Sequence, residues 1–259
     1  MILRDAIDAL SAVVFAAPCR VCHAPLLKLS RIPICEKCLE SMEEIHGPVC
    51  QVCGRPNLYV DGASPEPSKC RLCRSDFFSF NCARSYALYT GATASAIQML
   101  KYEEVTRLGE FFGDRLAEVA LGEEEDFKAD VVVPVPLHAD RLRERGYNQA
   151  EMIARPLARR LGVELGSYLL VRKLPRPPQL LLTRAERWQS VLGAYAIREG
   201  IRVDNLRVLL VDDVMTTGAT LDSCSRALKK AGAAAVAGLT VARVVPQRRQ
   251  LRSSDQGLP

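Results

Sequence analysis

The segment Val208–Thr220 constrains the fold of this 259-residue chain more than any other. Four apolar residues, Val208–Val211, run directly into two acids, Asp212 and Asp213, and then into a turn that ends Thr-Thr-Gly-Ala-Thr. This order predicts a buried strand that delivers both carboxylates to its carboxyl end, followed by a tight turn that opens a helix. Ligands of open α/β sheets bind at that edge of the sheet.

The turn from Thr216 to Thr220 suits a sugar phosphate. Its small residues leave backbone N–H groups free to surround a phosphate, and the N-terminus of the following helix favours the negative charge. The two carboxylates just before the turn suit the vicinal hydroxyls of a ribose, directly or through Mg²⁺. The alternative is an ordinary strand–turn–helix junction in which Asp212 and Asp213 only cap the helix.

The same segment resembles the phosphoribosyl pyrophosphate (PRPP) signature of type I phosphoribosyltransferases. That signature is four apolar residues, two acids, two loose positions and then Thr/Ser-x-Gly-Gly/Ala-Thr/Ser, and every required position is filled here. The resemblance implies that Asp212 and Asp213 hold the ribose of PRPP. It also implies a 5′-phosphate site made by Thr216, Thr217, Gly218, Ala219 and Thr220.

Eight of the ten cysteines form four Cys-x-x-Cys pairs. Each pair points two thiolates at one ion from a tight turn, and two such knuckles complete a tetrahedral Cys₄ site. Four knuckles therefore predict two structural zinc ions in a double zinc ribbon, with the knuckles paired either in sequence order or in a cross-braced arrangement. The expected zinc ligands are Cys19, Cys22, Cys35, Cys38, Cys50, Cys53, Cys70 and Cys73.

Three other uses of these cysteines fit the sequence less well. Disulfides would need an oxidising compartment, and nothing in the sequence supports export. Thioredoxin-like redox chemistry uses one such pair rather than four, and the repeated ribbon spacing favours zinc over an iron–sulfur cluster.

Residues 19–73 hold six prolines and show weak apolar periodicity, so they need metal to fold. Zinc supplies on the order of 10 kcal/mol per site. The single residues Cys82 and Cys224 are expected to be small buried side chains.

Beyond the cysteines, apolar strands alternate with helical patterns, which predicts an α/β fold with a parallel sheet flanked by helices. The expected organisation is an N-terminal amphipathic helix in residues 1–18, a double zinc ribbon in 19–80, a phosphoribosyltransferase-like domain in 81–245 and a flexible tail in 246–259.

The main domain should contain four strands and four helices. The strands are expected at 83–88, 129–135, 206–211 and 233–241. The helices are expected at 92–102, 108–121, 149–161 and 219–231. An acidic loop is expected at 123–126, and Pro156 should interrupt or kink the third helix.

The net charge of +5 is unevenly distributed. Between Ala139 and Ser190 there are eleven basic and five acidic residues, so this window holds the whole basic excess and suits a phosphate-rich ligand or a nucleic acid. Near its start, a proline-stiffened strand exit leads into a loop with Arg141, Arg143 and Arg145, whose guanidinium forks match phosphate oxygens. Residues 172–195 predict a mobile flap over the site or, alternatively, a surface arm or a nucleic-acid contact.

Taken together, these motifs closely resemble the ComF family of bacterial phosphoribosyltransferase-domain proteins with an N-terminal double zinc ribbon. The resemblance implies a cytoplasmic role in competence, meaning DNA uptake and natural transformation, near incoming single-stranded DNA. The motifs occur in family order: the four knuckles, Cys53–Pro56, Leu100–Tyr102, Val133–His138, Arg145–Ala150, Arg184–Arg187 and the PRPP signature.

The family resemblance also places further residues at the site. It implies that the turn from Pro136 to Arg145, including Leu137 and His138, faces the pyrophosphate, and the Leu-Lys-Tyr match alone adds Lys101. The flap departs from the family, because Gln179–Leu182 replaces a run such as Gln-Thr-Gly-Leu and Ser190 stands where Asn is expected. This departure casts doubt on a catalytic role of the flap more than on PRPP binding.

Two functions fit this sequence. In the first, the chain is an enzyme in which an acceptor displaces pyrophosphate from PRPP, with Mg²⁺ as cofactor. In the second, it is an adaptor that binds single-stranded nucleic acid and keeps a regulatory or vestigial PRPP pocket. Aromatic side chains could stack on bases, although 77–80 could instead pack the ribbon onto the domain. No apolar run reaches eighteen residues, so no membrane-spanning helix is expected. The acceptor and the oligomeric state are not predicted. The stacking candidates are Phe77, Phe78, Phe80, Tyr147 and Trp188.

Overall fold

The computed structural model describes residues 17–26, 30–56, 69–174, 188, 191 and 193–245. The expected N-terminal helix, most of the expected flap and the tail from residue 246 lie outside these ranges. Among the helices that are described, none is both long and apolar enough to cross a membrane.

The main domain is built on a five-stranded sheet in which every strand pair is parallel, as the alternating pattern predicts. The strand order across the sheet is β1-β7-β6-β2-β3. A separate antiparallel pair, β4 and β5, lies beside it. The bounds are β1 Cys82–Leu88, β2 Val131–Pro134, β3 Glu164–Leu165, β4 Leu170–Arg172, β5 Tyr195–Ile197, β6 Arg207–Met215 and β7 Ala235–Arg243.

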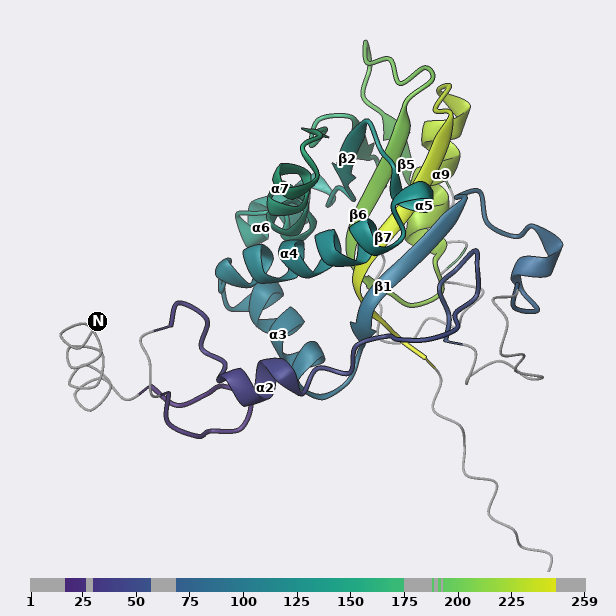
Figure 1. The fold of residues 1–259 in the computed structure, drawn as a ribbon. Helices are drawn as coiled ribbons and strands as arrows, with labels where there is room; N and C mark the ends of the chain where they lie inside the picture. The colour runs from purple at the N-terminus through teal and green to yellow at the C-terminus, as the bar shows by residue number, and fades with distance from the viewer. Residues whose placement is uncertain are drawn as a thin grey trace, which may run out of the picture.

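Helices cover both faces of this sheet (Figure 1). One face carries α3 (Gly91–Tyr102), α4 (Arg107–Gly122) and α7 (Gln149–Leu161), and the other carries α9 (Ala219–Lys230) with the β4–β5 pair. Because side chains alternate along a strand, β6 contributes to both cores. Leu209 and Val211 pack with α4 and α7, whereas Val208 and Leu210 pack on the side of α9.

The strand order places a topological switch point between β2 and β6. These neighbours pair in parallel, with Val131 opposite Val208 and Pro134 opposite Val211. The chain leaves β2 through α7 toward β3, and it leaves β6 through α9 toward β7 on the opposite face. The connections therefore diverge, and a crevice opens at the carboxyl ends of these two strands, where open α/β sheets bind ligands.

The cysteine-rich module covers the outer edge of β1. The backbone N–H groups of Ile45 and Leu88 donate to Tyr86 and Glu43 at 2.8 Å, and Ala83 N–H donates to Val52 at 2.7 Å. Such pairing removes the exposed strand edge that would otherwise invite aggregation. The module itself holds the short helix α2 (Glu36–Glu40) and the 3₁₀ turn η2 (Cys73–Ser75).

Two expected loops are helical. Residues 123–126, expected as an acidic loop, contain the start of α5 (Glu124–Phe127), and the expected arginine loop forms α6 (Ala139–Arg145). α6 begins after His138, whose Nδ1 accepts from the N–H of Asp140, and it ends at Gly146, whose φ of +80° suits a glycine stop. These capping signals were present in the sequence.

Two further expectations need correction. Pro156 was expected to interrupt or kink its helix, and the interruption does not occur, because Pro156 lies inside one continuous helix, α7. Gly113 of α4 lets Pro156 approach closely, because a Cβ on that glycine would lie 2.4 Å from the proline ring. In addition, β6 continues to Met215, so Asp212 and Asp213 belong to the strand instead of following it.

Candidate functional site

A cavity of about 650 Å³ opens at the carboxyl ends of β2 and β6. It brings together all but two of the residues predicted for the ligand site; the exceptions are Thr217 and Arg143. The predicted residues that line it are Lys101, Leu137, His138, Arg141, Arg145, Asp212, Asp213, Thr216, Gly218, Ala219 and Thr220.

The turn at the start of α9 has the geometry of an anion-binding loop. Gly218 is the N-cap, with a φ of +84° that other residues rarely adopt. The Oγ1 of Thr217 accepts from the N–H of Ala219 at 3.3 Å, so this hydroxyl braces the turn from behind the cavity. The helix is twelve residues long, and the positive end of its dipole faces the same space.

Gly218 is also confined by its neighbours. A Cβ at this position would lie 2.8 Å from Cε1 of Phe78 and 2.9 Å from Cε of Met215. Phe78 belongs to the segment that joins the cysteine-rich module to β1, so this module helps to shape the loop. A sequence reading explains the glycine by its turn, but only the fold reveals these two contacts.

The two acids at the end of β6 have different surroundings. Asp213 is 5% exposed, and its Oδ2 lies 2.8 Å from Nζ of Lys101. Asp212 is half-buried, and its Oδ1 accepts from the N–H of Asp213 at 2.9 Å. Burial lowers the pKa of Lys101, but the charge and hydrogen bond of Asp213 outweigh it, so the net pKa is raised. Lys101 is therefore a fixed cation in the cavity at neutral pH.

The helical form of α6 separates its three arginines. Arg141 and Arg145 are four residues apart, so both can reach the cavity from one helix face. Arg143 lies between them on the opposite side, where it is 77% exposed and pairs with Asp140 at 2.6 Å. The predicted pyrophosphate contact therefore has support from the placement of Arg141 and Arg145 but not from that of Arg143. The guanidinium of Arg145 also lies over the ring of Tyr102, 5.2 Å from its centroid.

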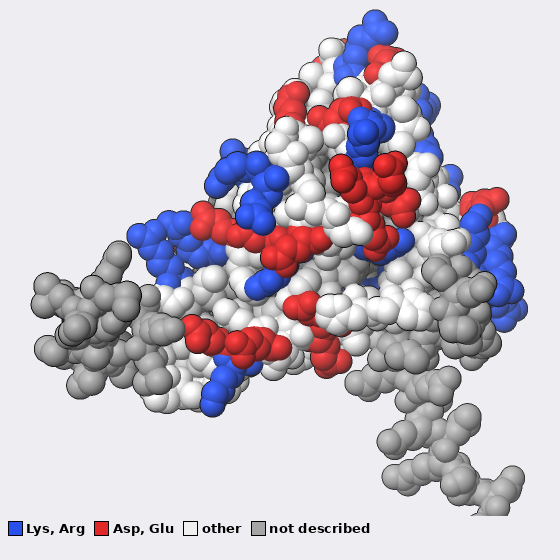
Figure 2. Space-filling model, in the orientation of Figure 1, with Lys and Arg blue, Asp and Glu red and all other residues white. Residues whose placement is uncertain are grey.

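Charge is segregated on the molecular surface. Figure 2 shows acidic side chains gathered over α4 and α5 and basic ones where α6 and α7 lie. This arrangement favours an anionic ligand at the α6 side of the sheet.

The motif from Arg145 to Ala150 connects the parts of the site. The hydroxyl of Tyr147 donates to the carbonyl of Leu100, next to Lys101. Asn148 donates to the carbonyl of Val135 at 3.0 Å and accepts from the N–H of Ala150 at 3.1 Å, which caps α7. Tyr147 and Asn148 thus hold the end of α3 and the exit of β2 together.

Several residues that line the cavity were not predicted from the sequence. Arg172 and Tyr195 come from β4 and β5, at the two ends of the predicted flap, and Arg172 Nη1 donates to the Tyr195 hydroxyl at 2.9 Å. The basic character of the flap window was a signal for Arg172. The other flap residues singled out above, Gln179–Leu182 and Ser190, are outside the described residues. The remaining additions to the lining are Tyr89, Tyr102, Val135, Gln149, Val214, Met215, Leu221 and Val244. Pro136, the first residue of the turn expected to face the pyrophosphate, lines the cavity too.

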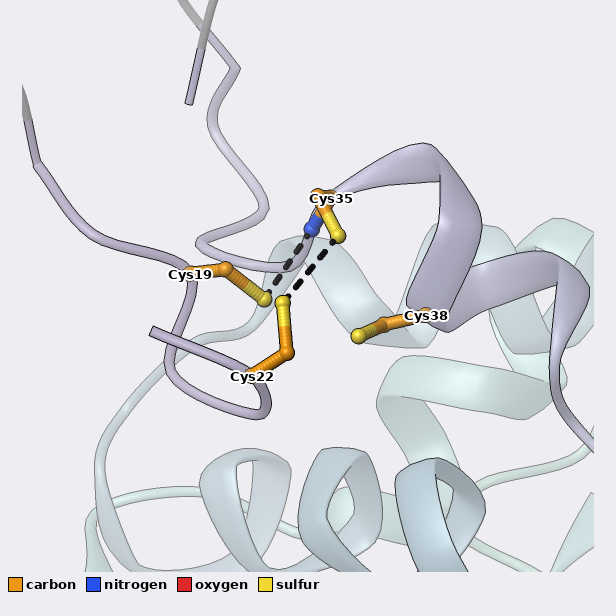
Figure 3. A group of neighbouring side chains, drawn as sticks. All are labelled: Cys19, Cys22, Cys35 and Cys38. Carbon is orange, nitrogen blue, oxygen red and sulfur yellow. Dashed lines mark hydrogen bonds between the residues drawn. The ribbon is translucent and has the colours of Figure 1, made fainter. Parts of the chain in front are cut away.

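The eight knuckle cysteines form two separate groups of four, which pair the knuckles in sequence order. Figure 3 shows the four thiols of the first group converging from two loops and α2. The described cysteines form no disulfides. The first group is Cys19, Cys22, Cys35 and Cys38, and the second is Cys50, Cys53, Cys70 and Cys73.

The geometry of both groups fits zinc. Sulfurs about 2.3 Å from a central zinc form a tetrahedron with edges of about 3.8 Å. The Sγ atoms of Cys22 and Cys35 are 3.6 Å apart, and those of Cys53 and Cys70 are 3.8 Å apart. A backbone N–H from the following knuckle donates to the first sulfur of each group, at 3.3 Å in both. Thiolates accept such bonds well, so the two groups suggest two structural zinc ions.

The groups lie against opposite faces of the sheet. The first packs with α3 through Cys19, Ile34 and Cys38, and the second packs with the core on the side of α9. The remaining cysteines, Cys82 and Cys224, are buried, as predicted. Burial raises the pKa of the Cys82 thiol to about 12, so it stays neutral.

Two known domain families match separate parts of the chain. The phosphoribosyl transferase domain family matches residues 147–255, and the double zinc ribbon domain family matches residues 10–75. The chain is thus a phosphoribosyltransferase-domain protein with an N-terminal double zinc ribbon.

Its curated relatives narrow this class. DNA utilization protein YhgH of Salmonella typhimurium is 27% identical over 221 residues, which is 84% of this chain and 93% of that protein. Competence protein ComFC of Bacillus subtilis is 28% identical over 221 residues, which is 81% of this chain and 84% of that protein. Together with the two matching domain families, these similarities support a ComF-family protein.

Solved structures add little to this assignment. Glutamine PRPP amidotransferase from B. subtilis aligns with 21% identity and a TM-score of 0.39. The alignment covers 56% of this chain and 30% of that one.

Proposed function

We propose that the cavity binds PRPP and that an acceptor displaces its pyrophosphate at C1′. One observation carries this proposal: the Gly218 loop, the Asp212–Asp213 pair and two arginines of α6 line a single cavity at the switch point of the sheet. The chemistry of these three groups suits the three parts of PRPP, which are the 5′-phosphate, the ribose and the pyrophosphate.

Each group has a role in this proposal. The N–H groups at the start of α9 would hold the 5′-phosphate, and Asp212 and Asp213 would hold the ribose hydroxyls. Arg141 and Arg145 would stabilise the charge that develops on the leaving pyrophosphate. Carboxylate oxygens also suit Mg²⁺, which would neutralise the pyrophosphate when bound. The protein's contribution would then be mainly positioning and electrostatics.

The relatives' names support a role for this activity in DNA uptake or utilisation. The free thiols grouped for zinc fit a reducing compartment, so we place the chain in the cytoplasm. Competence proteins and single-stranded DNA are the proposed partners. The acceptor is not identified.

Calorimetric titration of PRPP with Mg²⁺ tests the proposal. The zinc-loaded chain should bind, and an Asp212→Asn, Asp213→Asn double variant should lose at least tenfold in affinity. Asn keeps the shape of Asp and removes its charge. Asp114→Asn is the control, because this exposed residue of α4 lies away from the cavity. Absence of binding by the wild type would overturn the proposal.

One observation favours the second function, a single-stranded nucleic-acid adaptor. Tyr102 is 68% exposed at the cavity rim with Arg145 over its ring, an arrangement on which a base can stack. Other stacking candidates are occupied: Phe78 and Phe80 are buried and stack at 4.6 Å, and Trp188 lies against Phe77 at 4.6 Å. DNA binding that survives the Asp212, Asp213 double variant and falls with Tyr102→Ala would support this function.

A further inference from the structure

Arg243, the last residue of β7, is the largest fully buried side chain in the described structure and is 2% exposed. A buried guanidinium is costly unless an opposite charge compensates it. Within the described ranges, no carboxylate forms an ion pair with Arg243. Its guanidinium instead reaches the second cysteine group, where Nη1 donates to the carbonyl of Cys53 at 2.5 Å and Nη2 lies 3.7 Å from its Sγ.

The charge of a zinc centre explains this placement. Four thiolates around one divalent ion leave a double negative charge, which also needs compensation when it is buried. All four cysteines of the second group are buried, whereas Cys22 of the first group is exposed to water. The group that needs a buried cation is therefore the one that has it.

The same nitrogen of Arg243 that donates to Cys53 also contacts a residue of the cavity wall. This Nη1 lies 3.0 Å from Sδ of Met215. The backbone continues the connection, because Val244 N–H donates to Met215 at 3.0 Å and Tyr89 N–H donates to Arg243 at 2.9 Å. Tyr89 and Val244 both line the cavity.

A second connection runs in parallel through the segment after η2. Phe78 lies against Gly218, and the N–H of Ser79 donates at 2.6 Å to Oδ1 of Asp222, a buried residue in the first turn of α9. Both connections therefore join the second cysteine group to the phosphate loop.

We propose that Arg243 is a positioning residue that compensates the charge of the second zinc centre and couples this centre to the phosphate loop. Zinc at this centre and a phosphorylated ligand in the cavity then stabilise each other, because coupling between two binding sites is reciprocal. The second half of this proposal rests on the proposed PRPP site, whereas the first half does not.

The first group makes a different connection, which supplies the control. Arg20 pairs with Glu103 at the end of α3, and both side chains are about half exposed. Arg20→Met and Arg243→Met each remove an arginine that links one cysteine group to the main domain. The Arg20 contact differs because it lies at the surface and away from the phosphate loop. Exposed pairs of this kind contribute little.

The experiment measures zinc release from the full chain to a chromogenic chelator, with and without PRPP and Mg²⁺. Arg243→Met should release one of its two zinc ions at least tenfold faster than the wild type, and Arg20→Met should release both at wild-type rates. PRPP should slow release of that same zinc ion in the wild type. Wild-type release from Arg243→Met would overturn the role in zinc binding.

Two further outcomes keep the halves of the proposal separate. Arg243→Lys retains the charge but not the planar guanidinium, whose Nη1 contacts both Cys53 and Met215. This variant should hold both zinc ions and bind PRPP about tenfold more weakly. If Arg243→Met does not fold, the coupling is tested with Arg243→Lys alone. A wild-type PRPP affinity of Arg243→Lys would overturn the coupling. If the wild-type chain binds no PRPP, the proposed function fails, but the release rates still test Arg243 as the partner of the zinc centre.

Discussion

The Nζ of Lys101 lies 2.8 Å from Oδ2 of Asp213, which joins α3 to the end of β6 across the cavity. Both side chains are largely buried, so each charge depends on the other for compensation. The family motif placed Lys101 at the site, but it gave no partner for it. The ion pair shows how a residue more than a hundred positions earlier in the chain can lie against Asp213 and compensate its charge.

Replacing Lys101 by Met should destabilise the chain by about 3 kcal/mol, because it leaves the buried carboxylate of Asp213 without a counter-ion. Urea unfolding of the zinc-loaded chain measures this loss. Lys229→Met is the control, since Lys229 is exposed in the last turn of α9 and should cost about 0.5 kcal/mol or less. A loss below that of the control would show that Asp213 does not depend on Lys101.

The same pair predicts a dependence on pH. The pKa of Lys101 is raised above its ordinary value of 10.5, so its stabilising contribution is fully present below that pH. The contribution is lost as the pH rises through the higher pKa of the folded state. The difference in unfolding free energy between wild type and Lys101→Met should be constant from about pH 7 to 9 and shrink above about pH 10.5. A difference that shrinks already between pH 7 and 9 would contradict this assignment.

The arginines of α6 should differ in their effect on PRPP affinity. Arg141→Gln and Arg145→Gln should each weaken binding about tenfold, which corresponds to the loss of roughly one charge-assisted hydrogen bond of about 1.5 kcal/mol. Arg143→Gln should stay within about twofold, because its side chain points to solvent and pairs with Asp140. Titration calorimetry of the three variants checks this order. Equal losses in all three would mean that only net charge matters.

The sequence predicted the fold and named many of the residues that line the cavity, because both depend on local patterns. The apolar run before Asp212 marked β6, and the glycine-containing turn marked the start of α9. Four regularly spaced knuckles predicted the two cysteine groups. Periodicity and motif spacing carry this information without any knowledge of long-range contacts.

The errors arose where tertiary context decides. The arginines at 141, 143 and 145 occupy alternate positions, and this segment was expected to be a loop. Only the helical form of α6 shows that Arg143 faces away from Arg141 and Arg145. Pro156 is tolerated within α7 where Gly113 makes room for its ring. Arg243 gave no signal in the sequence, since a lone arginine after an apolar strand has the pattern of an exposed strand end. Its burial depends on the cysteine module, which lies far from it along the chain.

Gly218 should be more sensitive to substitution than its turn alone requires. Gly218→Ala should cost about 2 kcal/mol or more, because an alanine at a φ of +84° is strained and its Cβ would overlap Phe78 and Met215. Gly200→Ala is the control, since its φ of +79° is similar but no atom lies within 4 Å of the added Cβ, so about 1 kcal/mol is expected. Urea unfolding gives both losses, and PRPP titration should show weaker binding only in Gly218→Ala. Equal stability losses with equal PRPP affinities would mean that the Phe78 contact has no role in shaping the phosphate loop.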